Sequence, residues 1–234
     1  MRRQRELDTA NRRTVAAHVA RRPRQRRGNV FLLVAAIVLA IAGASILLYS
    51  NWPKPGGLFD MAGNLVEPDD QSGVSGPDAT GLEGESSPDI GWQFEVPAVG
   101  LKVPLGSSAA TEGVINPPGF QSVYWINNLG VGLDNAAAGT IYTATHSLRG
   151  GGVAPGNYLI DVDSQQAKVK TGDQIKVGPH SFTVTQTLVV SKLGVMAVDG
   201  LWDPLPRRLV VITCMQNPQN APSVDNLVVI ARLD

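Results

Sequence analysis

The longest apolar stretch of the chain lies near its N-terminus, between Val30 and Ser50. These 21 residues include no charged side chain. At a rise of about 1.5 Å per residue, a helix of this length spans the roughly 30 Å hydrocarbon core of a bilayer. Tyr49 and Trp52, at its C-terminal end, are residue types that favour the membrane–water interface. The pattern predicts one transmembrane helix over residues 30–50.

Charge is distributed unevenly around this segment. Residues 1–29 contain ten arginines and two acidic residues, a net charge of +8, whereas the other 205 residues carry −8. Because basic residues favour the cytoplasmic side, we expect residues 1–29 to be a cytoplasmic tail and the rest to be extracellular. A cleaved signal peptide, with a shorter apolar region and a short basic region, is the less favoured alternative. The overall charge of zero argues against a globally basic nucleic-acid-binding protein.

Residues 51–90 change to glycine, proline, serine and acidic side chains, and no apolar period persists. A segment of this composition cannot bury enough apolar surface to offset the entropy lost on ordering. We therefore expect a disordered stalk. Docking of the short Leu-Phe-Asp-Met piece at residues 58–61 is the less favoured alternative.

Residues 91–234 alternate between short runs rich in valine, isoleucine and threonine and clusters of glycine, proline, asparagine and aspartate. Such runs are typical of β-strands separated by turns. The expected strands are Trp92–Val96, Leu101–Pro104, Thr140–Thr145, Tyr158–Val162, Gln174–Val177, His180–Val190, Leu209–Cys214 and Leu227–Leu233. About eight strands and few helices predict an all-β, mainly antiparallel domain. We favour a closed barrel over a sandwich, because closure removes exposed sheet edges.

Two residues with nucleophilic or acid–base chemistry end predicted strands. Cys214, the only cysteine, follows the run Leu209–Thr213, and His146 ends the run before a glycine-rich loop. If these two strands are parallel and adjacent, the thiol and the imidazole meet, which is the arrangement of an activated nucleophile. An inert buried cysteine and a structural histidine are the alternative. One cysteine and three histidines exclude a multi-cysteine metal site and leave little for a metal centre, so we expect no metal and no cofactor.

The order of these features resembles the sortases, cysteine transpeptidases of the Gram-positive cell surface. A basic tail, an anchor and a stalk precede a domain with T-A-T-H at residues 143–146 and V-I-T-C at 211–214. The second motif matches the last two positions of the family's T-L-x-T-C. The K-T-G-D turn at 170–173 resembles the family's G-D-x-I turn, and N-L-V-V-I-A at 226–231 its last strand. The resemblance covers about residues 91–234 and is nearest the actinobacterial classes E and F.

The resemblance implies a sortase-type β-barrel and a mechanism without a metal or cofactor. Cys214 would attack the Thr–Gly carbonyl of an L-P-x-T-G-like sorting signal, and His146 would protonate the leaving amine and deprotonate the incoming one. The implied partners are secreted proteins with a C-terminal sorting signal, a cell-wall precursor or other amine acceptor, and the lipid around the anchor; no nucleic acid is expected. A weakly catalytic sortase-fold domain that binds sorting signals or wall peptides, and an unrelated anchored β-domain, are the alternatives.

The sequence departs from the family at the arginine that follows the cysteine and stabilises the oxyanion. No arginine lies between residues 209 and 231. If the last strand is antiparallel to the cysteine strand, Asn226 lies beside Cys214, and Arg232 lies about 20 Å further along at about 3.4 Å per residue. Asn226, through its amide, and Arg149, in a loop expected to be mobile, are the candidate oxyanion donors, and Arg232 is expected to be structural.

Overall fold

The computed structural model describes residues 34–39, 57–66, 73–78 and 85–234. The chain divides into two compact units, Met1–Pro55 and Gly56–Asp234. In the first unit, residues 34–39 are helical. The predicted tail at 1–29 and the rest of the predicted span at 30–50 lie outside the described residues. No helix in the described part of the chain has the length and apolar character needed to cross a membrane.

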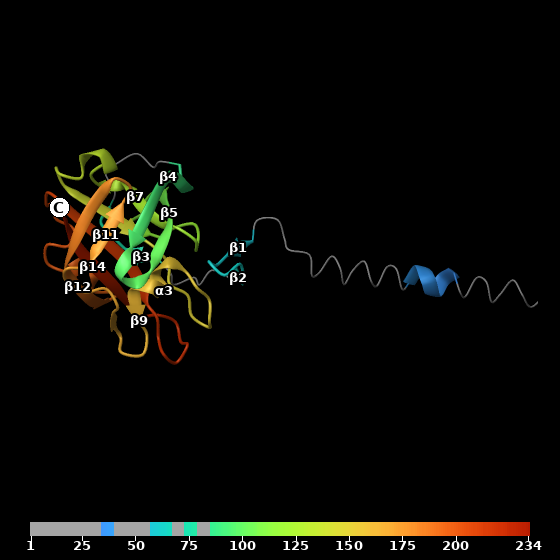
Figure 1. Cartoon of the computed structure of the whole chain (residues 1–234). Coiled ribbons are helices and arrows are strands. Elements are labelled where there is room, and N and C mark those ends of the chain that lie inside the picture. Colours follow the sequence, from blue (N-terminus) through green and yellow to red (C-terminus); the bar gives the residue numbers. More distant parts are fainter. Residues whose placement is uncertain (1–33, 40–56, 67–72, 79–84) are drawn as a thin grey trace, which may run out of the picture. The chain divides into compact units, whose positions relative to one another are not determined.

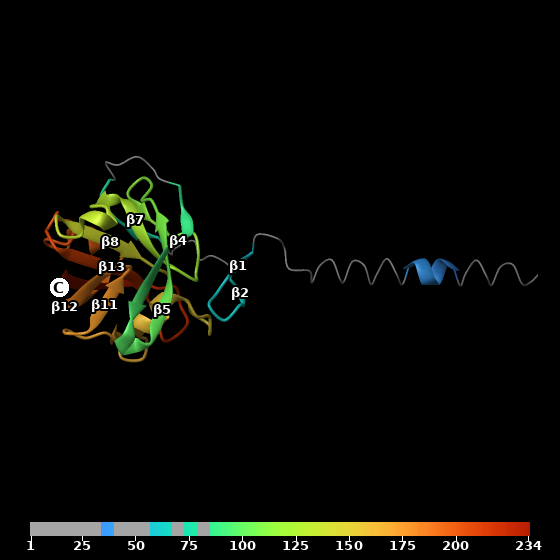
Figure 2. The ribbon, with the colours of Figure 1, turned by 45° about the horizontal axis from the view of Figure 1, so that its top comes forward.

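The second unit is built around a closed barrel of eight strands (Figures 1 and 2). Around the barrel the order is β11-β12-β14-β13-β8-β7-β5-β4. The barrel strands are β4 (Ser87–Val96), β5 (Leu101–Ser108), β7 (Val123–Gly130), β8 (Thr140–Ala144), β11 (Gln174–Val177), β12 (His180–Ser191), β13 (Arg208–Met215) and β14 (Asp225–Leu233). Two neighbouring pairs, β8 with β13 and β5 with β7, are parallel, and the other pairs are antiparallel. The prediction of a mainly antiparallel, closed barrel is confirmed.

Short elements complete the described fold. They are β1 (Leu58–Phe59), β2 (Leu65–Val66), β3 (Val74–Ser75), η1 (Pro97–Val99), β6 (Val114–Ile115), η2 (Leu133–Asn135), α3 (Pro155–Leu159), β9 (Ile160–Asp161), β10 (Gln166–Ala167) and η3 (Val195–Ala197). Of the predicted strands, Tyr158–Val162 is right only at Ile160–Asp161, which form the short strand β9 outside the barrel, because its first two residues end helix α3. Strand β7 was not predicted, so the predicted number of barrel strands is right although one member of the set differs.

Apolar side chains point to both faces of strand β13, because both faces are covered by other parts of the protein. Leu209 and Val211 belong to the cluster that fills the barrel. Val210 and Ile212 belong to a second cluster, on the other face, which includes Val195 from the connection after β12. Every residue of β13 is therefore buried, which explains its continuous run of β-branched side chains.

The pairing of β13 with its two neighbours sets the geometry of its C-terminal end. Ile212 pairs with Ala144 of the parallel strand β8, and Cys214 pairs with Asn226 of the antiparallel strand β14. At the opposite end of β13, Arg208 pairs with Arg232. The expectation that Asn226 lies beside Cys214 and that Arg232 lies far from it is confirmed.

The described parts of the expected stalk are structured, contrary to the prediction of a disordered segment over residues 51–90. Strands β1 and β2 form a hairpin, and β3 pairs with β6. Asp60, in the L-F-D-M piece, is fully buried, and its main-chain oxygen accepts a hydrogen bond from the side chain of Gln121 at 2.9 Å. The main-chain N–H of Met61 donates to Val153 at 2.8 Å. The less favoured docking alternative is thus the correct one, and the domain begins well before residue 91.

The carboxylate of Asp60 explains why this polar segment folds against the barrel. It accepts hydrogen bonds from the main-chain N–H groups of Ala62, Asn64 and Val153 and from the Asn64 amide. Burial opposes ionisation of Asp60, but these hydrogen bonds together lower its pKa below the usual value. The hairpin is therefore held by polar contacts, which a pattern of apolar residues does not predict.

Candidate active site

The parallel pairing of β8 and β13 brings the predicted histidine and cysteine to the same edge of the sheet. Beyond the Ala144–Ile212 pair, the main-chain N–H of Thr145 still donates to the Ile212 oxygen at 3.0 Å. His146 and Cys214 each lie two residues past that pair, so they are level along the two strands. Side chains two residues apart share one face of a strand. Cys214 therefore lies on the same face of β13 as Ile212, which belongs to the outer apolar cluster.

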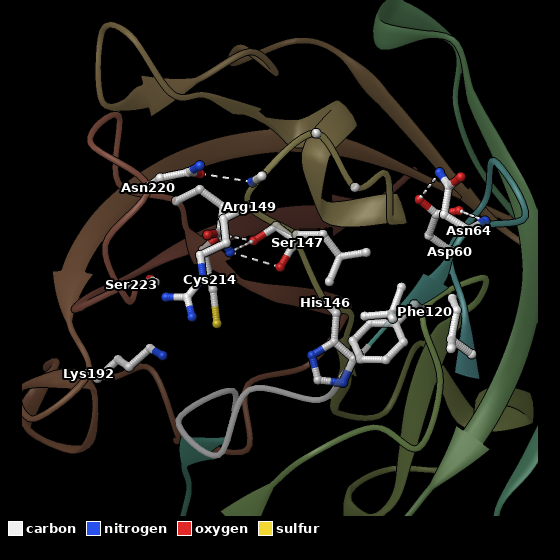
Figure 3. Close-up of a pocket in the computed structure, with 17 residues that line it drawn as sticks. Asp60, Asn64, Phe120, His146, Ser147, Arg149, Lys192, Cys214, Asn220 and Ser223 are labelled. Carbon is white, nitrogen blue, oxygen red and sulfur yellow. Dashed lines mark hydrogen bonds between the residues drawn. The ribbon is translucent and has the colours of Figure 1, made fainter. Parts of the chain in front are cut away.

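His146 and Cys214 line one cavity of about 650 Å³. Each side chain is only 4% exposed. Figure 3 shows the Cys214 sulfur pointing into the cavity between the Arg149 guanidinium group and the His146 ring. The described residues that line the cavity are Asp60, Asn64, Leu65, Val66, Phe120, His146, Ser147, Leu148, Arg149, Gly150, Gly151, Gly152, Lys192, Cys214, Gln216, Asn220 and Ser223.

The His146 ring is held in one orientation and one tautomer. Its Nε2 atom lies 2.7 Å from the main-chain oxygen of Pro117. A carbonyl oxygen can only accept, so Nε2 carries the proton and, in the neutral ring, Nδ1 is the basic nitrogen. Phe120 packs against the ring with a centroid separation of 4.7 Å. The ring is thus oriented by the loop before β7, with Nδ1 available for proton transfer.

Burial lowers the pKa of His146 below its usual value. The hydrogen bond to Pro117 opposes this shift, and the positive charge of Lys192 adds to it. At neutral pH the ring is therefore uncharged. A neutral imidazole is the form that can accept a proton from a thiol.

We expect acidification to destabilise the folded domain through this ring. Because the pKa of His146 is lowered on folding, the unfolded chain takes up its proton at a higher pH than the folded chain, so stability is full above about pH 6.5 and falls as the pH drops through that value. Urea unfolding at about pH 7.5 and pH 5.5 measures the loss for the wild type and for His146→Gln. The wild type should lose more stability than the variant. Equal losses would contradict a buried, neutral ring.

A polar clamp joins the loop after His146 to the loop after Cys214. The Ser147 hydroxyl donates to the main-chain oxygen of Cys214 at 2.6 Å. The Gln216 amide donates to the main-chain oxygen and the hydroxyl of Ser147 at 2.8 and 2.9 Å. The two strand ends are therefore locked together next to the reacting groups. Neither clamp residue was predicted from the sequence, although each lies within two positions of a predicted site residue.

Hydrogen bonds hold the main chain on both sides of Arg149. The side chain of Asn157, in α3, accepts from the Leu148 N–H at 2.9 Å and donates to the Leu148 oxygen at 2.8 Å. On the other side, the N–H of Gly150 donates to the Asn220 side chain at 2.8 Å. The residues before and after Arg149 are thus held by main-chain hydrogen bonds, while the Arg149 side chain lines the cavity.

Asn226, the other candidate donor, occupies a different environment. It is completely buried beside Cys214 on β14, and neither atom of its amide has a hydrogen-bond partner among the described residues. It is absent from the lining of the cavity. A buried amide without a partner carries a free-energy penalty of about 1–3 kcal/mol. The structure therefore places Arg149 in the lining of the cavity and Asn226 outside that lining.

The described residues contain no group of three or more histidine, cysteine, aspartate or glutamate side chains that could hold a metal ion. Among the described lining residues, the ionisable side chains are those of Asp60, His146, Arg149, Lys192 and Cys214. Lys192 is a further lining residue that no sequence pattern predicted. It follows β12 directly, at a position without a recognisable motif.

A scan against protein-family models finds no match, and neither does a search of curated proteins. Among solved structures, sortase A of Listeria monocytogenes is similar with a TM-score of 0.45 and 18% identity, over 63% of this chain and 88% of that chain. A pilus-related sortase C of Group B Streptococcus has a TM-score of 0.46 and 18% identity, over 64% and 69%. Sortase C-1 of Actinomyces oris has 0.43 and 13%, over 63% and 75%. Because all three TM-scores are below 0.5, the assignment of function rests on the geometry of the cavity.

Proposed function

We propose that the chain is a sortase-type cysteine transpeptidase. The observation that carries this proposal is the convergence of His146 and Cys214, from the level ends of two parallel neighbouring strands, in one cavity with Arg149. A nucleophile, a base and a charge-stabilising group in one cavity are the parts that acyl transfer requires. The T-A-T-H and V-I-T-C motifs at residues 143–146 and 211–214 support the same reaction class.

In the first half-reaction, Nδ1 of His146 takes the thiol proton and the Cys214 sulfur attacks the carbonyl carbon of a Thr–Gly bond in an L-P-x-T-G-like signal. A new C–S bond forms as the carbonyl oxygen becomes an oxyanion. The C–N bond then breaks, and the imidazolium returns its proton to the leaving amine. A thioester now links the threonine carbonyl to Cys214.

In the second half-reaction, an amine acceptor attacks the thioester. His146 removes a proton from the incoming amine, the C–S bond breaks, and the thiolate leaves and is protonated. The substrates are thus a secreted protein with a sorting signal and a cell-wall precursor or another amine. The neutral ring and its fixed tautomer suit both proton transfers.

Arg149 is the first choice for the group that stabilises the oxyanion. Its side chain points to the sulfur from the side opposite His146 (Figure 3). The hydrogen bonds of Asn157 and Asn220 to the neighbouring main chain hold its loop in place before substrate binds. Charged donors that are fixed in advance stabilise developing negative charge at little reorganisation cost.

Trapping of the thioester tests the proposed function. The chain, incubated with an L-P-x-T-G-type peptide, should gain the mass of the peptide segment that ends at threonine, and proteolysis should place this mass on the peptide that contains Cys214. Addition of an amine should release the adduct as a new amide. Absence of any adduct on a protein whose Cys214 still reacts with a small alkylating agent would contradict the proposal and favour a binding domain.

We further propose that residues 30–50 anchor the protein in the cell membrane, with residues 1–29 in the cytoplasm and the barrel outside, and that the chain is nearest to the actinobacterial sortases of classes E and F. The asymmetric charge around the uncharged run supports the orientation.

A protease added to intact protoplasts tests this topology. It should digest the barrel, residues 57–234, and leave an epitope at residues 1–29 intact until the cells are lysed. A cytoplasmic protein should survive in the same sample as the control for intact membranes. Protection of the barrel before lysis would overturn the orientation.

A further inference from the structure

The hairpin of strands β1 and β2 reverses the usual distribution of polar and apolar side chains. Asp60 is completely buried, whereas Leu65 is 64% exposed. A single exposed leucine needs no explanation, but Leu65 also lines the cavity that contains His146 and Cys214. The hairpin therefore presents an apolar side chain to the cavity instead of burying it in the core.

Hydrogen bonds hold the main chain before Leu65 in place. Asn64, the preceding residue, donates to the Asp60 carboxylate from its main-chain N–H at 2.8 Å and from its amide at 3.1 Å. The Asn64 main-chain oxygen accepts a hydrogen bond from the Asp60 N–H at 2.9 Å. Leu65 is thus positioned before any substrate binds, and a surface that is fixed in advance binds a ligand at a smaller entropic cost.

The hairpin lies at the His146 end of the cavity. The Asp60 main-chain oxygen accepts a hydrogen bond from the side chain of Gln121 at 2.9 Å. Phe120, the residue before Gln121, packs on the His146 ring. Figure 3 shows Asp60 and Phe120 on one side of His146 and Cys214 on the other. Along the cavity, His146 therefore lies between the thiol and the hairpin.

The hairpin end of the cavity offers hydrocarbon surface to a ligand. Val66 and Phe120 line the cavity together with Leu65. Asp60 is the one carboxylate among the described lining residues, and its oxygens already accept four hydrogen bonds. A bound ammonium group would have to displace some of these hydrogen bonds, whereas an apolar group can pack on the exposed side chain of Leu65.

The proposed reaction places the amine acceptor at the same end. His146 must lie within hydrogen-bonding reach of the incoming amine to remove its proton, while the acyl group is bonded to Cys214. The chain that carries the amine therefore leaves the reacting centre on the His146 side, away from the acyl group. The hairpin lies on that side.

We propose that Leu65 forms an apolar subsite for the amine acceptor, so that the enzyme prefers an acceptor with an apolar side chain next to the residue that carries the amine. This inference rests on the proposed transpeptidase function. Val66 and Phe120 extend the apolar surface, but Leu65 determines the specificity because most of its side chain is exposed and is available to be covered. Contact with an apolar acceptor removes hydrocarbon surface of both partners from water, which stabilises the complex.

Partitioning of the thioester between an amine and water measures this preference. The enzyme is incubated with an L-P-x-T-G-type peptide and a fixed concentration of one acceptor, and the ratio of amide product to hydrolysis product is recorded. Both products arise from the same thioester, so the ratio does not depend on the rate at which the thioester forms. Glycyl-leucinamide and glycyl-asparaginamide present the same amine and side chains of similar size. The ratio should be about four- to tenfold higher for the leucine acceptor, the effect of removing one or two methyl groups from water.

Matched variants assign the preference to Leu65. Leu65→Asn should reduce the preference to less than about twofold, and Leu65→Ile should retain it. Phe59→Asn is the control, because Phe59 is the exposed cross-strand partner of Leu65 in the hairpin but is absent from the lining of the cavity. This variant should keep the wild-type preference.

The outcomes separate a failure of the subsite from a failure of the proposed function. If the thioester forms but both acceptors react equally or not at all, the inference fails and the proposed function stands. A preference that survives Leu65→Asn, or that is lost equally in Phe59→Asn, also overturns the subsite. If Cys214 forms no thioester with the peptide, the proposed function fails, and with it the subsite.

Discussion

Cys214→Ala should abolish transpeptidation completely while the barrel stays folded. The thiol is the only one in the chain and lines the same cavity as His146, so no other group can form the thioester. The side chain lies at the penultimate position of β13 and lines the cavity, so its removal should cost no more than about 1–2 kcal/mol of unfolding free energy. The measurements are turnover of a fluorogenic L-P-x-T-G-type peptide and a urea unfolding curve for wild type and variant.

Turnover and urea unfolding together distinguish an enzyme from a protein with an inert buried cysteine. A folded variant that still forms the acyl product would refute the nucleophilic role of Cys214. A variant that unfolds, paired with a wild type that does not turn over the peptide, would indicate a packing residue. Met215→Leu is a matched control, since it changes the next residue of β13, which faces the barrel interior, and should leave the chemical step unchanged.

Arg149→Ala should lower kcat for the same peptide by about 10²–10³, the usual loss when one oxyanion donor is removed. Its side chain lines the cavity from a loop held on both sides, and KM should change far less than kcat because the contact forms chiefly in the transition state. Arg149→Lys should recover part of the loss. Single-turnover rates of thioester formation report this step directly.

Arg232→Ala and Asn226→Ala complete the comparison. Arg232 pairs with Arg208 at the far end of the strands, so its loss should leave the chemical step within about tenfold of wild type. Asn226 is buried beside Cys214 outside the cavity lining, and a loss larger than that of Arg149→Ala would make its amide the donor instead. If Arg232→Ala alone abolished turnover, the pairing of β13 with β14 would be wrong.

Most barrel strands could be predicted because they carry the pattern of buried β structure. Strand β11 begins and ends at the predicted residues, and β13 and β14 differ by one or two residues. Strand β7 was missed because two asparagines interrupt its apolar run, and asparagine is typical of turns. The structure shows why one of them fits in a strand. The Asn128 amide donates to the Ala110 oxygen at 2.9 Å and accepts from the Ala110 N–H at 2.8 Å, in place of a turn.

The site could be predicted only in part. His146 and Cys214 stand out because each ends an apolar run, and their convergence followed from one assumption, that the two strands are parallel neighbours. The hairpin, the Ser147–Gln216 clamp and Lys192 could not be inferred in this way. Their positions depend on hydrogen bonds between residues far apart in the sequence, such as Val153 with Asp60 and Ser147 with Cys214, and no local pattern encodes such pairs.

The parallel pairing of β8 with β13 also has a consequence for how the protein acquires its reactivity. Thr140 and Arg208, at the start of this pair, are 68 residues apart, and contacts across such separations form slowly because a long loop must close first. Strand β13 also pairs with β14, the last of the barrel strands in sequence order. Until both pairings have formed, the Cys214 thiol does not share a cavity with His146, Arg149 and Lys192. During refolding, the reactivity of the Cys214 thiol should therefore return when the barrel closes. In a newly made chain, the thiol should stay unreactive until β14 has paired with β13.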